Sequence, residues 1–170
     1  MKSLITLFIA LFVSASFSFA GDSVKIKGTV ASNNKKCDGA EINIYDGNNL
    51  VEVSLADSKG RFNIELHAGA RYTVRFSKGE LIAKNIVFDL RVNSLGNSPE
   101  EFECDVYLYP PSYMSGMSSS VLDFPMAILE YNERKERLEF NAEYTNTMQE
   151  LYQNMLIFAE TTDRNIWQEE

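Results

Sequence analysis

The chain has 170 residues, of which 45% are hydrophobic, and a formal net charge of −8. This acidic balance disfavours nucleic acid as a partner, because a phosphate backbone would repel the chain. One histidine and two cysteines are too few ligands for a structural zinc site, and we expect no cofactor.

The first twenty residues are typical of a secretory signal peptide. Lys2 supplies a positive start, residues 4–13 are nearly all apolar, and Ser18-Phe19-Ala20 places small residues at the two positions that signal peptidase reads. A membrane anchor is the competing interpretation, but ten apolar residues rise only about 15 Å as a helix, half of a bilayer core. We therefore expect cleavage before Gly21, export to the periplasm, the cell surface or the medium, and no transmembrane segment in the mature chain.

Residues 22–109 are predicted to form a mainly β domain. Apolar and polar residues alternate in seven short runs, each expected to turn its apolar side inward, and clusters of turn residues separate the runs. The gaps are too short for crossover helices, so the pattern predicts an antiparallel sandwich of seven strands. The apolar positions are Val24, Ile26 and Val30; Ile42 and Ile44; Val51, Val53 and Leu55; Phe62, Ile64 and Leu66; Tyr72, Val74 and Phe76; Ile86, Phe88 and Leu90; and Phe102, Cys104, Val106 and Leu108.

The sharpest turn signal is Asp57-Ser58-Lys59-Gly60. Aspartate accepts hydrogen bonds from the backbone of its own turn, and glycine adopts the left-handed conformation that closes a hairpin. A calcium site at Asp57 is the functional alternative, but one carboxylate is too few for an ion that takes six to eight oxygens. We therefore expect a structural turn.

Four short stretches resemble the carboxypeptidase regulatory-like family. They are Gly28-Thr29-Val30, Gly39-Ala40-Glu41-Ile42, residues 57–62 (DSKGRF) and residues 69–74 (GARYTV), and the likeness runs from Val24 to Leu90. The resemblance implies a transthyretin-like (prealbumin-like) β-sandwich, similar to Cna-B-type and starch-binding-like modules and common in bacterial cell-envelope proteins. Its motifs are turns and runs of alternating apolar and polar residues, so the resemblance indicates the fold but says almost nothing about function.

Cys37 and Cys104 are the two cysteines. In an oxidising compartment a disulfide between them would close a loop of about 67 residues and stabilise the fold by roughly 4 kcal/mol in the chain-entropy model. Two unpaired thiols are the alternative, with Cys104 as a small core residue. The spacing alone does not decide between them.

Residues 110–120 (PPSYMSGMSSS) are predicted to be a linker, because they are rich in Pro, Gly and Ser. In the segment 121–170 that follows, residues 126–131 and 137–140 bracket a charged turn, which predicts a hairpin.

The period then becomes helical, with Asn141 as a plausible N-cap and Glu143 in the first turn. The apolar face of this helix either packs back onto the sandwich or hairpin, or docks on another molecule. The residues of this candidate partner face are Tyr144, Met148, Leu151, Met155 and Phe158.

Residues that could support catalysis are few. His67 is the only histidine, it falls at a strand end, and nothing around it resembles a nucleophile elbow. Glu103 and Asp105 lie on the outer face of their strand by alternation, where solvated surface charge is the better interpretation. We therefore predict that the protein is not an enzyme.

These observations predict a non-catalytic exported envelope module that acts through protein–protein contacts, with another cell-envelope protein or a second copy as its partner. The predicted contact surfaces are the C-terminal helix and the linker. The alternative is a carbohydrate-binding β-sandwich module, which needs solvent-facing aromatic residues; Tyr45, Tyr107 and Tyr109 fit by alternation.

Overall fold

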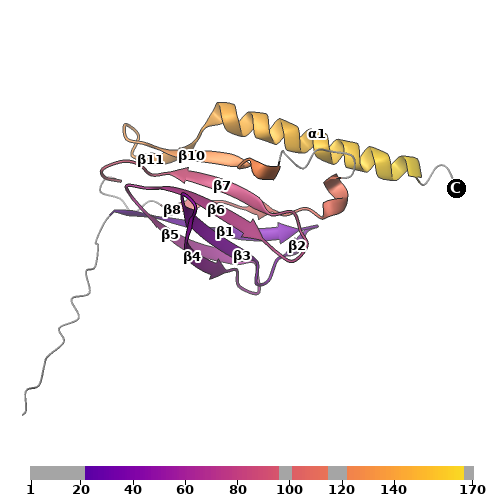
Figure 1. The fold of residues 1–170 in the computed structure, drawn as a ribbon, viewed down its shortest axis with the longest axis horizontal. Coiled ribbons are helices and arrows are strands. Elements are labelled where there is room, and N and C mark those ends of the chain that lie inside the picture. The colour runs from indigo at the N-terminus through magenta and orange to yellow at the C-terminus, as the bar shows by residue number, and fades with distance from the viewer. Residues whose placement is uncertain (1–21, 96–100, 115–121, 167–170) are drawn as a thin grey trace, which may run out of the picture.

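The described part of the chain contains two β-sheets, one long helix and a short 3-10 helix (Figure 1). The computed structural model describes residues 22–95, 101–114 and 122–166, and their side chains except those of Met114 and residues 155–166. The predicted signal peptide and most of the predicted linker lie outside these ranges. The predicted fold class, a mainly β sandwich followed by a C-terminal helix, is confirmed.

The first sheet is built around β1 (Ser23–Ser32). This strand pairs antiparallel with β2 (Lys35–Lys36) and β5 (Arg61–His67), and parallel with β8 (Glu101–Glu103) and β9 (Val106–Tyr107). The sequence pattern predicted one antiparallel strand over residues 102–108, whereas the structure has two short parallel strands. Parallel pairing needs a crossover connection, and the chain has one here, because the preceding strand lies in the other sheet.

The second sheet has six strands, and the predicted hairpin is part of it. The hairpin strand β10 pairs parallel with β7, which places Ala127 and Leu129 beside Ile86 and Phe88 on the inner face. The hairpin, which the sequence placed after a linker, therefore extends the sandwich. The strand order is β11 (Arg137–Phe140), β10 (Ala127–Asn132), β7 (Lys84–Asp89), β6 (Arg71–Ser77), β3 (Glu41–Asp46) and β4 (Asn49–Leu55).

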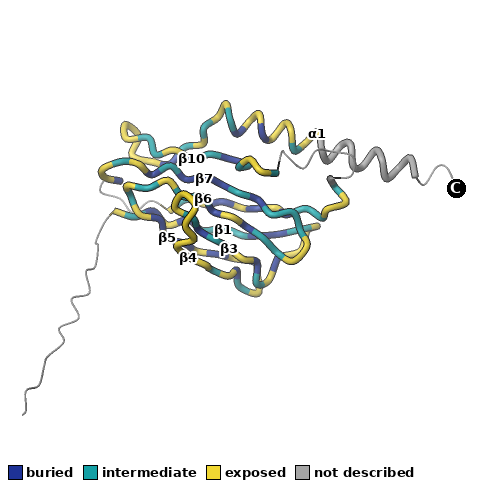
Figure 2. The backbone as a smooth tube through the Cα atoms, viewed as in Figure 1, coloured by how far each residue is buried: buried dark blue, intermediate teal, exposed yellow. Residues whose placement is uncertain are grey.

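The core lies between the two sheets, and six of the seven predicted runs supply it. Their inward residues are buried, as the dark segments of β1, β3, β6 and β7 show in Figure 2, except Tyr72 and Phe102, which are partly buried against the core. The remaining run, Val51 to Leu55 in β4, is exposed along almost its whole length. The largest fully buried side chains are Phe76, Phe88, Ile26, Ile42, Ile44, Leu66, Leu90, Leu108 and Leu129.

The turn at Asp57 has the predicted structural role. Its carboxylate accepts hydrogen bonds from the backbone N–H groups of Lys59 (2.8 Å) and Arg61 (2.9 Å) and from the Arg61 guanidinium. These bonds, led by the Arg61 side chain, lower the pKa of Asp57 to about 2. Gly60 has φ +70° and lies against Val30, where a side chain would meet the backbone.

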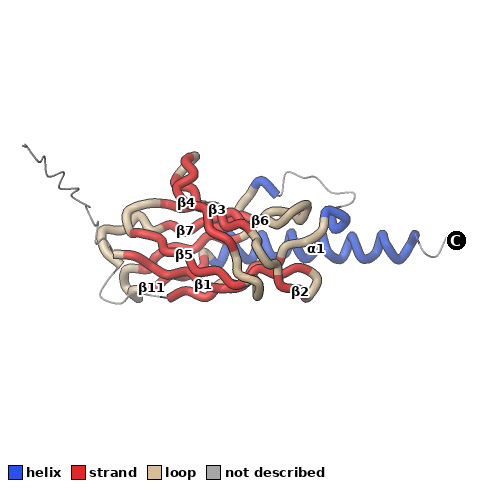
Figure 3. The backbone as a smooth tube through the Cα atoms, turned by 90° about the horizontal axis from the view of Figure 1, so that it is seen from below, coloured by secondary structure: helices blue, strands red, loops and turns tan. Residues whose placement is uncertain are grey.

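Helix α1 (Ala142–Ile166) begins directly after β11. Asn141 caps it as predicted, because its side-chain oxygen accepts a hydrogen bond from the backbone N–H of Tyr144 (3.1 Å). The helix first lies along β10 and the short 3-10 helix η1 (Pro111–Met114), and it then runs past the end of the sheets (Figures 1 and 3).

Candidate interaction surface

Exposed apolar side chains gather on β4. Among the residues that the structure describes, four of the eight large exposed hydrophobic side chains belong to this strand, and they are 52–62% exposed. Single exposed apolar residues are ordinary on protein surfaces, but a contiguous group on one strand is typical of a contact surface. The four residues are Leu50, Val51, Val53 and Leu55.

The β4 strand faces the opposite way from its predicted orientation. Ser54 lies opposite Ile42, and Glu52 lies opposite Ile44. Directly opposed residues of an antiparallel pair point to the same face, and Ile42 and Ile44 point into the core. The polar residues of β4 therefore lie on the inner side, and Val53 and Leu55 lie on the outer side. The prediction that Val51, Val53 and Leu55 face inward is wrong, because alternation reveals two faces but not which one the core covers.

A β-bulge brings Leu50 to the same outer side. The register between β3 and β4 shifts after Ile44, so that Leu50 lies opposite Tyr45 and Val51 is the extra residue. Tyr45 is on the outer face of β3, one position from the core residue Ile44, and its partner Leu50 shares that face. We call Leu50, Val51, Val53 and Leu55 the outer β4 row.

Among the described residues, the outer β4 row lies along a free edge of the six-stranded sheet. β4 ends the strand order and has β3 as its neighbour. At the other edge, by contrast, Phe140 of β11 packs against Phe102 of β8 with 5.6 Å between the ring centroids. Exposed edges are commonly protected by lysine, proline, a bulge or an inward charge. β4 has the bulge at Val51 and the inward Glu52, but residues 41–55 contain no Lys, Arg or Pro, and Val53 to Leu55 are in regular register with β3. Among the described residues that part of the edge pairs with no strand besides β3, so it can accept another strand.

The predicted partner face of α1 is in part used within the molecule. Met148 and Thr145 are buried, and the Tyr144 hydroxyl donates a hydrogen bond to the Pro125 carbonyl (2.7 Å). Leu151 is 39% exposed, so the buried face is already incomplete two turns into the helix. The side chains of Met155 and Phe158 lie outside the described residues. The first half of α1 thus packs on its own sandwich.

A buried lysine lies where this helix meets the sandwich. Lys84 is 4% exposed, and its ammonium group lies 4.3 Å from the ring centroid of Tyr109 and 4.9 Å from that of Tyr152 on α1. Burial lowers the pKa of Lys84 to about 8. In the described part of the chain no carboxylate pairs with it. The sequence pattern did not predict this contact. Lys84 nevertheless lies on the same side of its strand as the inward residues Ile86 and Phe88, two and four positions further along.

The three tyrosines predicted for sugar stacking do not form one platform. Tyr45 belongs to the six-stranded sheet, whereas Tyr107, which is 50% exposed, belongs to β9 in the other sheet. Tyr109 is half-buried against Tyr113, with 5.6 Å between the ring centroids, and against Lys84. Carbohydrate binding therefore stays a prediction for which the described residues supply no assembled site.

The residues considered for catalysis lie apart on the surface. His67 is exposed at the end of β5. Glu101 and Glu103 form ion pairs with Lys27, and Asp105 accepts hydrogen bonds from the backbone N–H (2.9 Å) and hydroxyl (2.7 Å) of Thr29. These carboxylates serve the pairing of β1 with the 101–107 segment. Over the described ranges no three His, Cys, Asp or Glu side chains are placed to hold a metal ion.

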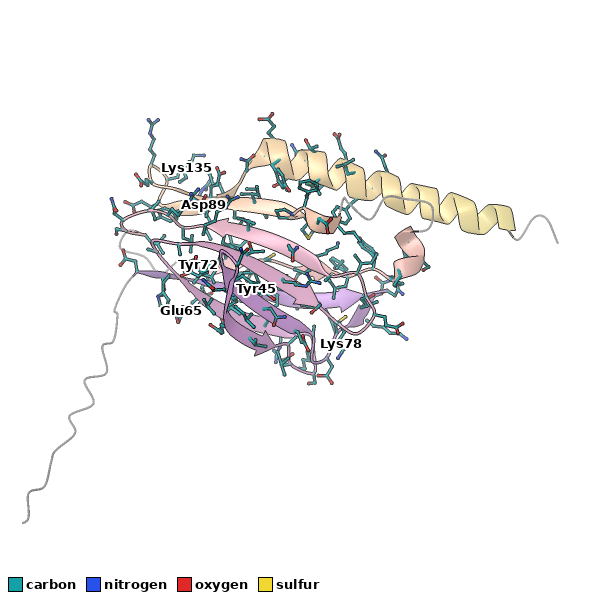
Figure 4. All side chains as sticks on the ribbon, viewed as in Figure 1. Tyr45, Glu65, Tyr72, Lys78, Asp89 and Lys135 are labelled. Atoms are coloured by element: carbon teal, nitrogen blue, oxygen red, sulfur yellow. The ribbon has the colours of Figure 1, made fainter. Side chains whose placement is uncertain are left out.

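Further ion pairs gather at the hairpin end of the sandwich, where Figure 4 shows Asp89 and Lys135. Asp89 pairs with Arg91, and Glu139 pairs with Lys135 (2.8 Å) and Arg137 (2.7 Å). Hydrogen bonds from Lys135 and Arg137 lower the pKa of Glu139 to about 2. The bases in these pairs are exposed to solvent, so the pairs contribute little to stability.

The two cysteines, predicted as a candidate disulfide, are both free and buried. The backbone N–H of Cys37 donates to Val30 (2.9 Å), and that of Cys104 donates to Lys27 (2.9 Å). Val30 and Lys27 are an odd number of residues apart, so these bonds lie on opposite edges of β1. Two segments that flank one strand are about 10 Å apart, too far for a disulfide, which needs Cα atoms within about 7 Å.

No helix in the described part of the chain is long and apolar enough to cross a membrane.

Comparison with known proteins yields structural likenesses only. No family model matches the sequence, and no curated protein matches it. The TIE protein of Bacillus anthracis matches with a TM-score of 0.41 and 20% identity, over 52% of this chain and 17% of that chain. A DUF3823 family protein from Parabacteroides merdae matches with a TM-score of 0.36 and 16% identity, over 53% and 47%.

A catechol 1,2-dioxygenase from Acinetobacter sp. ADP1 also matches, with a TM-score of 0.39 and 11% identity, over 56% of this chain and 55% of that chain. Each match covers about half of this chain, and this chain spans less than two thirds of each of these proteins. At these identities and TM-scores, the likenesses assign neither a family nor an activity to this chain.

Proposed function

We propose that this protein is an exported, non-catalytic domain of the carboxypeptidase regulatory-like type that acts through protein–protein contacts at the outer β4 row. The single observation that carries the proposal is the inverted edge strand, which presents four apolar side chains to solvent beside unpaired backbone groups. An exposed apolar edge of this kind is a liability unless a partner covers it. The signal-like residues 1–20 and the regulatory-like stretches support the compartment and the family.

The contact is best tested with a substitution that changes only the surface. Val53 is 55% exposed at the middle of the row, so Val53→Lys is expected to leave the fold intact. Tyr107 is 50% exposed on the other sheet, and Tyr107→Lys is the matched control. Purification of the tagged wild type and both variants from the native envelope, with quantitative mass spectrometry, then compares what each one retains.

The expected result is that at least one binding protein, or the untagged chain itself, is lost with Val53→Lys and kept with Tyr107→Lys. Equal recovery with all three proteins would exclude the row as the contact surface. A chain that ends at Asn154 tests the other predicted surface, because it keeps the packed first half of α1. A binding protein lost only with this truncation would assign the contact to the second half of the helix.

A further inference from the structure

We infer that the outer β4 row binds a second copy of this chain, with the two β4 strands antiparallel about a twofold axis at Val53. The inference rests on the proposed function, because it names the partner at the same surface. Three features of β4 lead to it: the direction of its free backbone groups, the symmetry of its side-chain pattern, and the placement of its charges.

The backbone determines which registers are allowed. Ala56 exchanges hydrogen bonds with Gly39 and Ala40 on the β3 side (3.1 and 2.9 Å), so its N–H and C=O groups point toward β3. Successive residues of a strand direct these groups to alternate edges, so those of Val53 and Leu55 point away from β3, to the free edge. In an antiparallel pair, residues whose backbone groups point to the shared edge must lie opposite each other. A twofold axis at Val53 meets this condition. Each Val53 then exchanges both of its backbone hydrogen bonds with the second copy's Val53.

The pattern of apolar and polar side chains in residues 51–55 is symmetric about Val53. In the register centred there, Val51 lies opposite the second copy's Leu55, and Glu52 lies opposite the second copy's Ser54. Apolar residues therefore meet apolar residues, polar residues meet polar residues, and directly opposed side chains share a face. The two outer β4 rows merge into one apolar stripe across the seam, which is the self-complementarity that a twofold interface requires.

The two neighbouring registers are less favourable. An axis at Ser54 also satisfies the backbone rule, but it pairs only Val53 with Leu55 and leaves Val51 opposite the charged Asp57, beyond the end of β4. An axis at Glu52 satisfies the rule as well, but it would place the two Glu52 carboxylates directly opposite each other, which is destabilising. The axis at Val53 avoids this repulsion. The remaining acids of the hairpin, Glu41 and Asp46, are on β3, so the two sets are about three strand spacings, or roughly 14 Å, apart. That separation exceeds the screening length of about 8 Å at physiological salt.

Self-association of the purified full-length mature chain tests this directly by sedimentation velocity, from about 10 µM to about 1 mM, since a single edge contact is small and the dimer is expected to be weak. Wild type and Tyr107→Lys are expected to show the same concentration-dependent dimer. Val53→Lys places two ammonium groups opposite each other at the axis and is expected to remain a monomer. A wild type that is monomeric throughout, or a dimer that survives Val53→Lys, overturns the inference.

Ser54 reports the register itself, because it lies opposite the second copy's Glu52 twice per dimer. Ser54→Lys adds two opposite-charge pairs and is expected to tighten the dimer roughly 2- to 30-fold, while Ser54→Glu is expected to weaken it by a similar factor. The same change for both variants overturns the Val53 axis. If the chain is monomeric but Val53→Lys still loses an envelope protein, the second copy is the wrong occupant and the proposed function stands.

Discussion

Gly28 lies where two backbones approach too closely for any other residue. A Cβ atom at this position would be 1.8 Å from the carbonyl oxygen of Cys104 and 2.6 Å from its carbonyl carbon. Ordinary carbon–oxygen contacts are at least about 3.3 Å, so Gly28→Ala must push the 103–106 segment away from β1 by roughly 1.5 Å. Neither neighbour is the end of a flexible side chain, so the strain must be relieved by the backbone.

That displacement weakens the parallel half of the first sheet. The hydrogen bond from Cys104 to Lys27 (2.9 Å) is lost, and the bond from Leu108 to Ala31 (2.8 Å) is stretched. Leaving one buried backbone group unpaired costs about 1–3 kcal/mol, and overpacking adds about 1–3 kcal/mol. We expect Gly28→Ala to lower the free energy of unfolding by about 2–6 kcal/mol, as a lower urea midpoint with an unchanged slope.

Gly47→Ala is the control, because Gly47 has φ +58° and no atom within 4 Å of the added Cβ. It carries only the penalty of a left-handed residue, about 1 kcal/mol. If Gly28→Ala were no more destabilising than Gly47→Ala, the close approach of Cys104 to β1 would be refuted.

Three further predictions concern titratable groups. Folding lowers the pKa of Lys84 from 10.5 to about 8, so the unfolded chain binds more protons above pH 8. The free energy of unfolding is therefore expected to rise by ~1–2 kcal/mol from pH 8 to about 9.5. In urea titrations Lys84→Met should lose this rise, and an equal rise in the variant would contradict the prediction. The lowered pKa of Asp57 contributes stability above about pH 4 that is lost toward its folded pKa of about 2, so acid unfolding of Asp57→Asn should lack this component; coincident acid curves would argue against it. Cys37 and Cys104 are free and buried, and burial raises the pKa of Cys104 to about 11. A thiol reagent should therefore react with both cysteines after denaturation and only slowly with either before it. An intact mass lower by two hydrogens would instead reveal a disulfide.

The hairpin and the helix show how much of the structure local sequence patterns can predict. Residues 126–131 and 137–140 form β10 and β11 near the predicted bounds, and Asn141 caps α1. These features depend on alternation, turn residues and a capping side chain, which act within a few residues of one another. The pairing of β10 with β7 could not be predicted in this way, because the two strands are about 40 residues apart and their alternation is compatible with either direction.

The candidate surface depended on information that the sequence lacks. The alternation of Val51, Val53 and Leu55 correctly predicted a strand, but the face that it buries depends on which strands lie next to it and on the bulge at Val51. Lys84 gave a weak signal, as a charged residue at an inward position, and its tyrosine partners come from two distant segments.

The sequence alone determined that the chain is a β-sandwich with turns at Asp57–Gly60 and a capped C-terminal helix, because hydrophobic periodicity and turn chemistry act locally. The tertiary structure alone decided that β4 ends a sheet with its apolar side outward, that Cys37 and Cys104 flank opposite edges of β1, and that Lys84 is buried beneath α1. Each of these depends on contacts between segments distant in the chain, and the geometry of such contacts is a property of the assembled sheets.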